Sequence, residues 1–204
     1  MGIAERRARA KDELRQKILA AAVELFVENG YESVTMRGIA DRIEYSPATI
    51  YLHFRNKTEL TNAICADTFE TLIERLDALE ERNLPPLEAF LAGLRCYIAF
   101  GLEHPRQYQL VFGAPTPDDC GQDPATNQLG MQALEYLGRC LVRCRESGLF
   151  APGDTIGDAI AIWMQLHGVT TILINDHGRY DMPWPSKEAL IERSLELIVL
   201  GLRA

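Results

Sequence analysis

The sequence lacks the segments that mark exported and membrane-spanning proteins. Its longest apolar runs, 159–164 and 169–174, are far shorter than the roughly 20 residues needed to cross a bilayer. The first residues carry basic side chains with no apolar segment behind them, which is not the pattern of a secretory signal peptide. We therefore expect a soluble, cytoplasmic protein without a membrane partner.

The cysteines are too few and too irregular to form a disulfide framework. The sequence has five, an odd number, at positions 65, 96, 120, 140 and 144, so we expect reduced thiols. Cys140 and Cys144 are four residues apart, which places them on one face of a helix. Sensing of oxidation or of a metal ion by these two thiols therefore stays open as an alternative.

The motifs of common enzymes are missing as well. The sequence contains no HExxH zinc motif, no glycine-rich phosphate loop and no nucleophile elbow. We therefore predict that the protein is not an enzyme and that it requires neither a metal ion nor an organic cofactor.

The charge is unevenly distributed along the 204 residues, whose net charge is −8. Residues 1–60 carry ten Lys or Arg against nine Asp or Glu, and residues 61–204 carry eleven against twenty, which gives +1 and −9. At the start of the chain, basic side chains outnumber acidic ones, as expected of an arm that lies along phosphates. The basic residues of this arm are Arg6, Arg7, Arg9, Lys11, Arg15 and Lys17.

Apolar residues recur at helical spacing through almost every long segment, and no sustained alternation predicts a strand. Capping residues and helix breakers divide this all-α fold into about nine helices, and the glycines and prolines of 113–123 predict a loop. The predicted helices are 10–29, a short one after Thr35, 47–53, 57–81, 87–103, 106–112, 125–147, 154–176 and 186–203.

Two short helices with a tight turn between them, after a longer helix, have the outline of a helix-turn-helix DNA reader. Thr35 is placed to cap the first short helix, Ser46-Pro47 starts the second, and Glu44-Tyr45 form the turn. One face of the pair is apolar and is predicted to lie inward, through Ile39, Ala40, Ile43, Ile50 and Phe54.

The other face of the second short helix suits a DNA duplex. Tyr51 and Leu52 would be exposed there, where they can touch base edges or thymine methyl groups, and the small Pro47 and Ala48 let the backbone approach. Polar groups suited to phosphate oxygens belong to Thr35, Thr49, His53 and Lys57. A dimeric interaction module without DNA binding stays open, because residues 1–60 carry a net charge of only +1.

Residues 10–60, and above all LFVENGYESVTMRGIADRIEYSPATIYLHFRNKTEL, resemble the DNA-binding domain of the TetR family of transcriptional regulators. The resemblance runs without a gap through the pattern Thr49-Ile50-Tyr51-x-His53-Phe54 to Lys57 and Leu60. It implies a helix-turn-helix domain at 1–60 and a larger helical domain for ligand binding and dimerisation at 61–204.

Carried over by position, the resemblance implies specific roles for the predicted DNA-contacting residues. The candidates for base contacts are Arg37, Pro47, Ala48, Tyr51 and Leu52, and those for phosphate contacts are Thr35, Thr49, His53 and Lys57. Two features depart from the commonest family pattern. Glu44-Tyr45 replace small or apolar turn residues, and the apolar Leu52 removes a hydrogen-bonding side chain from the recognition helix.

The resemblance also implies a homodimer formed by the last two helices, which would bind a palindromic operator through recognition helices about one DNA turn apart. The last helix agrees physically, because its apolar surface is broader than packing on one side requires. The segment from Trp163 to His167-Gly168 looks like the Trp/His-Gly motif of one subgroup of the family's C-terminal domains.

The function implied by the resemblance is that of a ligand-responsive regulator, by default a repressor. We expect a small, apolar or aromatic effector in a pocket of the second domain, whose binding favours one of two conformations and so changes operator affinity. The candidate ligand-binding residues are Tyr97, Phe100, Tyr108, Phe112, Trp163 and His167.

Overall fold

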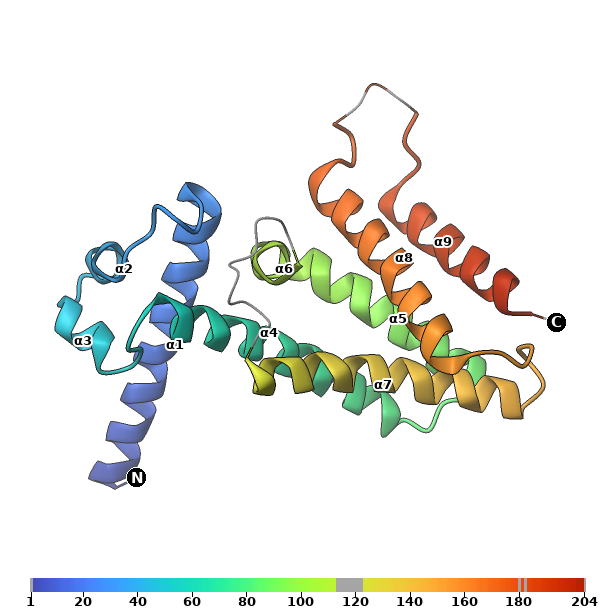
Figure 1. Ribbon diagram of the computed structural model, residues 1–204, viewed down its shortest axis with the longest axis horizontal. Coiled ribbons are helices and arrows are strands. Elements are labelled where there is room, and N and C mark those ends of the chain that lie inside the picture. The colour runs from blue at the N-terminus through green and yellow to red at the C-terminus, as the bar shows by residue number, and fades with distance from the viewer. Residues whose placement is uncertain (1, 113–122, 180, 182, 204) are drawn as a thin grey trace. The chain divides into compact units, whose positions relative to one another are not determined.

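The computed structural model describes residues 2–112, 123–179, 181 and 183–203, and within these ranges every regular element is an α-helix. The predicted all-α fold of about nine helices is confirmed, whereas residues 113–122 of the predicted loop lie outside the described residues. The helices are α1 (Ile3–Asn29), α2 (Met36–Arg42), α3 (Pro47–Tyr51), α4 (Lys57–Glu80), α5 (Pro86–Glu103), α6 (Pro105–Phe112), α7 (Pro124–Glu146), α8 (Thr155–Asn175) and α9 (Lys187–Leu202) (Figure 1).

The chain forms two compact units. Unit 1 comprises the described residues of Met1–Thr68 and Arg106–Asn127, and unit 2 those of Phe69–Pro105 and Gln128–Ala204. Unit 1 contains α1, α2, α3 and most of α6, whereas α5, α8 and α9 belong to unit 2. The helices α4 and α7 contribute residues to both units.

A hydrophobic core joins the helices of unit 1. Ile39, Ala40, Ile50 and Phe54 are buried in it and Ile43 packs against it half-buried, so the predicted inward face is confirmed. The opposite wall of this core comes from α1, the start of α4 and α6. Because α3 is only five residues long, these contacts hold it in place more than its own backbone hydrogen bonds do.

The first helix begins at Ile3 rather than near residue 10, so the predicted basic arm is the first part of α1. The Gly2 backbone N–H donates to the Glu5 carboxylate at 2.7 Å, which satisfies an N–H at the helix start. The alanines, arginines and lysine that follow are strong helix formers, and no residue among them breaks a helix. The helix ends as predicted, at Gly30, whose φ is 77°.

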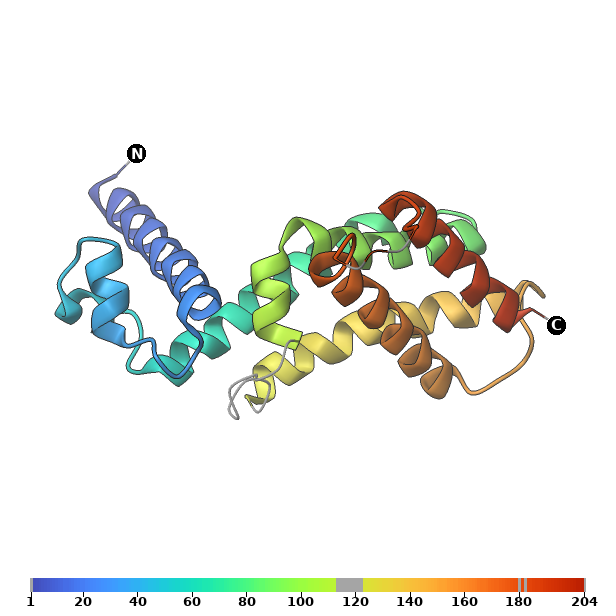
Figure 2. The same cartoon turned by 90° about the horizontal axis from the view of Figure 1, so that it is seen from above.

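Unit 2 is built around α5, the helix that packs against both α8 and α9. Figures 1 and 2 show α8 and α9 side by side. Gly93 of α5 permits a close approach to α7, because a Cβ atom there would lie 2.5 Å from the Tyr136 ring. A two-pronged ion pair joins α5 to α9 as well, with Arg95 Nε and Nη2 at 2.7 and 2.6 Å from the Glu192 carboxylate.

Candidate nucleic-acid interface

The two short helices of unit 1 are capped by the residues that the sequence predicted. Thr35 Oγ1 accepts the Gly38 N–H at 3.1 Å, and Ser46 Oγ accepts the Thr49 N–H at 3.2 Å. Glu44 closes the turn between the helices with φ at 61°, in the left-handed region that glycine or asparagine enters more readily. The turn is therefore strained at a position where the commonest family pattern differs.

The third helix is shorter than predicted, since it ends at Tyr51 rather than His53. The backbone tightens after Tyr51: the N–H groups of His53 and Phe54 both donate to the Ile50 carbonyl, at 2.9 and 3.0 Å. This turn brings Phe54 into the core, where it is buried. Leu52 and His53 are left on the outer side of the turn.

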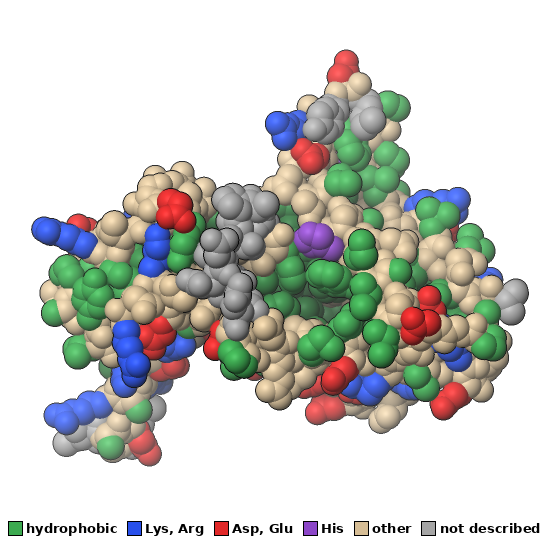
Figure 3. Space-filling model, in the orientation of Figure 1, with side chains coloured by type: hydrophobic (Ala, Val, Ile, Leu, Met, Phe, Trp, Pro, Cys, Tyr) green, Lys and Arg blue, Asp and Glu red, His purple; other side chains and the backbone are tan. Residues whose placement is uncertain are grey.

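The outer surface of α3 displays large apolar side chains. Leu52 is 80% exposed and Tyr51 is 53% exposed. Ala48 is exposed beside them, and Pro47 is half-buried. Arg37 of α2 is exposed too. Figure 3 shows hydrophobic side chains gathered over α2 and α3, so the exposed surface of these helices is partly apolar.

The hydroxyl groups predicted to meet phosphates take part in local structure. Thr35 caps α2 through its oxygen, and Thr49 Oγ1 lies 2.9 Å from Ser46 Oγ at the start of α3. A hydroxyl that accepts a hydrogen bond can still donate its own hydrogen. Thr35 therefore keeps its own hydrogen to donate, whereas the contact with Ser46 fixes the Thr49 hydroxyl at the start of α3.

Lys57 has a structural role that the sequence did not reveal. Its Nζ donates to the carbonyl oxygens of Tyr31 at 2.8 Å and Val34 at 3.3 Å, and it lies 4.0 Å from the centre of the Tyr31 ring. These contacts join the start of α4 to the connection between α1 and α2. The side chain is half-buried, so the ammonium group anchors that connection.

His53 lies next to the basic first half of α1. Burial lowers the pKa of its imidazole, and the charges of Lys11 and Arg15 lower this pKa further. The ring is therefore mostly neutral at pH 7. The Arg15 guanidinium lies 4.7 Å from the centre of the neighbouring Phe54 ring. The sequence predicted Lys11 and Arg15 only as members of an arm, not as neighbours of the end of α3.

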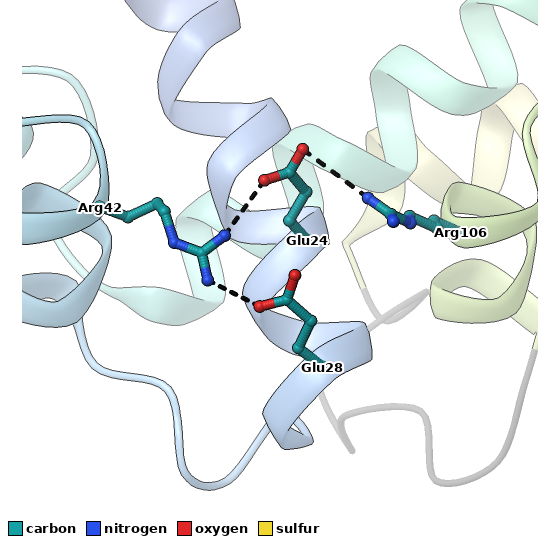
Figure 4. A network of polar contacts seen from close by, with 4 residues as sticks. All are labelled: Glu24, Glu28, Arg42 and Arg106. Carbon is teal, nitrogen blue, oxygen red and sulfur yellow. Dashed lines mark hydrogen bonds and ion pairs between the residues drawn. The ribbon is translucent and has the colours of Figure 1, made fainter.

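An ion-pair network joins α2 and α6 to α1 (Figure 4). The Arg42 guanidinium lies 2.6 Å from Glu28 and 3.3 Å from Glu24, and Arg106 lies 3.7 Å from the other Glu24 oxygen. The hydrogen bond from Arg42 lowers the pKa of Glu28. No sequence pattern indicated this network, because its members are far apart in the chain.

The predicted ligand-binding residues are divided between the two units. Tyr108 and Phe112 belong to unit 1, where their ring centres are 4.9 Å apart. In unit 2, Tyr97 and Phe100 of α5 are buried, whereas Trp163 is 37% exposed. The Trp163 ring stacks with that of His167, 6.0 Å between centres, because residues four apart in a helix lie on the same face.

A pocket that the sequence did not predict lies within unit 2, between α4 and α7. None of the six predicted ligand-binding residues contributes to it. Its lining is mostly polar, and consists of Ile73, Leu76, Asp77, Gln132, Glu135, Tyr136 and Arg139.

Comparison with known proteins settles the family. Residues 18–64 match the bacterial regulatory proteins of the tetR family, and residues 90–198 match the tetracyclin repressor-like C-terminal domain. The chain belongs to the TetR family. These matches do not identify the Trp/His-Gly subgroup, which stays a prediction.

Individual relatives agree with the TetR assignment. The HTH-type transcriptional activator FasR of Mycolicibacterium smegmatis is 32% identical over 103 residues, which cover 50% of this chain and 47% of FasR. The fold matches transcriptional regulator FadR from Bacillus subtilis in complex with stearoyl-CoA, with TM-score 0.77, 22% identity and 92% and 99% of the two chains covered. It also matches the ketosteroid transcriptional regulator KstR2 of Mycobacterium tuberculosis, with TM-score 0.72, 18% identity and 93% and 95% covered.

Replacement of Lys57 tests its anchoring role in the TetR-type domain. Lys57→Met keeps most of the side-chain volume but removes the ammonium donor from the Val34 carbonyl and from the Tyr31 carbonyl, which keeps only the Val34 N–H at 3.3 Å. We expect the free energy of unfolding in urea to fall by about 1–3 kcal/mol. Lys11→Met, which removes the same charge from an exposed position, should change it by less than about 0.5 kcal/mol. Equal stability of Lys57→Met and the wild type would contradict the anchor.

Proposed function

We propose that this TetR-family protein is a ligand-responsive transcriptional repressor that binds a palindromic operator as a cytoplasmic homodimer. The observation that carries the proposal is the surface of α3, where Tyr51 and Leu52 are exposed although the other face of the helix is fixed in a core. Apolar side chains on a short helix suit base edges and thymine methyl groups in a major groove. The helix-turn-helix arrangement is one that places such a helix in that groove.

In the domain that we assign to residues 1–60, the exposed side chains divide between bases and phosphates. We assign the base contacts to Arg37, Pro47, Ala48, Tyr51 and Leu52. The phosphate contacts fall to Thr35, Thr49, His53 and Lys57. Of the three donors of the Lys57 ammonium, two are used by the backbone carbonyls, and the third serves a phosphate.

The double variant Tyr51→Ala/Leu52→Ala tests the reading of bases. We expect affinity for a duplex recovered by selection from a random pool to fall about tenfold to a hundredfold per residue, with binding to random duplex retained. Fluorescence anisotropy with both duplexes measures this. Val27→Ala, which shortens another exposed apolar side chain of unit 1, is the control and should bind normally.

The binding assay also has an outcome that would contradict the proposal. Wild-type affinity in the double variant, with an unchanged melting temperature, would contradict the role of α3 in base recognition.

A reporter gene downstream of the selected duplex shows whether the protein represses or activates transcription. We expect its expression to fall when the protein is present, and a rise would identify an activator, as FasR is named.

The exposed faces of α8 and α9 support dimerisation through these two helices. By length and composition α8 is apolar enough to cross a membrane, yet only 28% of its most apolar window is buried. Three of its exposed apolar side chains share one face, since Ile160, Trp163 and Met164 are at helical spacing. Leu197 and Leu200 are exposed on α9. A second copy of the chain would cover both surfaces.

The variant Met164→Arg tests this interface. Two-fold symmetry brings the substituted residue into the interface once from each copy. Packing of α8 and α9 against those of the second copy would then have to bury two arginine charges. We expect sedimentation equilibrium to show monomers at concentrations where the wild type is dimeric. Met131→Arg on α7 is the matched control, because Met131 is 54% exposed and Met164 61%. A dimer that persists in Met164→Arg would rule out this surface.

The effector that we propose is a small apolar or aromatic molecule bound by residues 61–204. The buried aromatic side chains Tyr97 and Phe100 of α5 support this proposal, since effector sites in proteins are mostly apolar. Its chemical class is also supported by the neighbours in fold, one solved with stearoyl-CoA and one named for ketosteroids. Trp163 and His167 fit the α8 surface better than an enclosed site, because Trp163 is exposed.

Release of the selected duplex tests the effector class. We expect stearoyl-CoA or a ketosteroid to lower the affinity of the wild-type dimer for this duplex by about fivefold to 150-fold, the usual range of allosteric coupling. Coenzyme A alone should have no effect, because it lacks the apolar chain. If neither apolar compound changes duplex affinity or melting temperature, the proposed effector class is wrong.

Redox sensing through Cys140 and Cys144 is the weaker alternative. Both thiols are buried, and burial raises the pKa of Cys140 and raises that of Cys144 to about 11. The thiolate is the reactive form of cysteine, so both stay inert near neutral pH. Among the residues that the structure describes, no group of three or more His, Cys, Asp or Glu side chains is placed to hold a metal ion.

A further inference from the structure

The first part of α1 extends beyond the core of unit 1. Residues 4–13 are all exposed, and Figures 1 and 2 show this end of the helix projecting past α2 and α3. The helix needs only the residues from Leu14 onward to pack against the core. The preceding turns are therefore not explained by packing.

Three basic side chains share one face of α1, two of them in the projecting turns and the third, the half-buried Arg15, directly after these turns. Arg7, Lys11 and Arg15 are each four residues apart, so each is rotated by only about 40° from the one before, and together they span about 12 Å. We call them the basic ridge. The same face continues as Ile18 and Ala22, which are completely buried. The side of α1 that faces the core thus becomes basic where the core ends.

The acidic residues of this segment lie outside the basic ridge, and two of them have partners nearby in the chain. Glu5 accepts the Gly2 N–H, and Glu13 pairs with Arg9 at 2.9 Å on another face of the helix. Ala4 and Ala8 lie on the same face as the ridge, where their small side chains leave it accessible. Asp12 lies three residues before Arg15, yet among the described residues no ion pair joins Arg7, Lys11 or Arg15 to an acidic side chain.

The basic ridge is continuous with the proposed DNA-binding surface. The charges of Lys11 and Arg15 act on His53, and the Arg15 guanidinium lies 4.7 Å from the Phe54 ring, at the end of the turn that follows α3. The phosphates that flank the bases contacted by α3 would therefore lie next to the basic ridge. Their charge complements that of the ridge, and an ordered helix loses less entropy on binding than a disordered arm.

We infer that Arg7, Lys11 and Arg15 form a second phosphate-binding surface, which holds the duplex backbone beside the half-site contacted by α3. This inference rests on the proposed function, because it requires that α3 bind DNA. The ridge reads no bases. It adds affinity and salt dependence equally on every sequence, whereas α3 supplies the selectivity.

Two double variants with the same change of charge test the inference. Arg7→Ala/Lys11→Ala removes two members of the ridge, and Arg6→Ala/Arg9→Ala removes two arginines from the other side of the same turns. Alanine preserves the helix in both, as circular dichroism will show. Affinity is measured by fluorescence anisotropy from 50 to 200 mM salt, on the selected duplex and on a random duplex of about 30 base pairs.

Each phosphate contact contributes about 0.9 to the slope of log affinity against log salt. We expect Arg7→Ala/Lys11→Ala to lower this slope by about 1.8, so that its affinity falls about tenfold less than that of the wild type across the range. Arg6→Ala/Arg9→Ala should keep the slope of the wild type. The ratio of affinities for the selected and random duplexes should be unchanged in both.

Equal slopes in the two double variants would overturn the inference, as would a change in that ratio confined to the ridge variant. Failure of the proposed function gives a different result. In that case the wild type binds neither duplex, or Tyr51→Ala/Leu52→Ala leaves selectivity intact. If sequence-selective binding needs α3 but Arg7→Ala/Lys11→Ala and Arg6→Ala/Arg9→Ala change it equally, the proposed function stands and the basic ridge is wrong.

Discussion

The burial of Ile50 and Phe54 is the constraint on which the DNA-facing surface depends. A helix of five residues has too few hydrogen bonds to be stable alone, whereas a fully buried side chain of this size contributes about 1.5–3 kcal/mol. With these two residues inside, the geometry of a helix turns Ala48, Tyr51 and Leu52 outward. The same contacts that stabilise α3 thus decide which side chains meet a partner.

Much of this architecture could be predicted from the sequence because its signals are local. The bounds of α5 to α9 were predicted to within one residue, since prolines, glycines and capping side chains mark their ends. The start of α1 was missed because the apolar spacing begins only at Leu14, although nothing between Gly2 and residue 10 breaks a helix. The end of α3 was placed too late because the need to bury Phe54, which tightens the chain after Tyr51, is a tertiary effect.

Contacts between side chains and backbone atoms could not be predicted from the sequence, for another reason. The sequence shows that Lys57 is basic, but it does not show that the carbonyl oxygens of Tyr31 and Val34 lie within 3.3 Å of its Nζ. Any residue has a carbonyl oxygen, so no residue type indicates the acceptor. The place of Lys11 and Arg15 beside His53 was hidden similarly, because it depends on how α1 crosses the end of α3.

The sequence also does not show which face of an apolar helix is buried, and this affects the predicted ligand-binding residues of α8. Both faces of α8 carry large apolar residues, and only the structure separates the buried Ile162 and Leu166 from the exposed Trp163 and Met164. A periodic pattern predicts that a face is apolar, but not whether the same chain or another molecule covers it. The pairing of Trp163 with His167 was therefore predictable, whereas its exposure was not.

The ion pairs of unit 1 act on orientation more than on stability. Arg42, Glu24 and Arg106 are all more than a third exposed, and exposed pairs of this kind contribute little to stability. The core already fixes where α2 lies, through Ile39 and Ala40. The guanidinium of Arg42, held between two carboxylates of α1, instead limits rotation of α2 about those buried contacts. Because salt screens these pairs but not the core, we expect the orientation of α2 to depend on ionic strength more than its burial does.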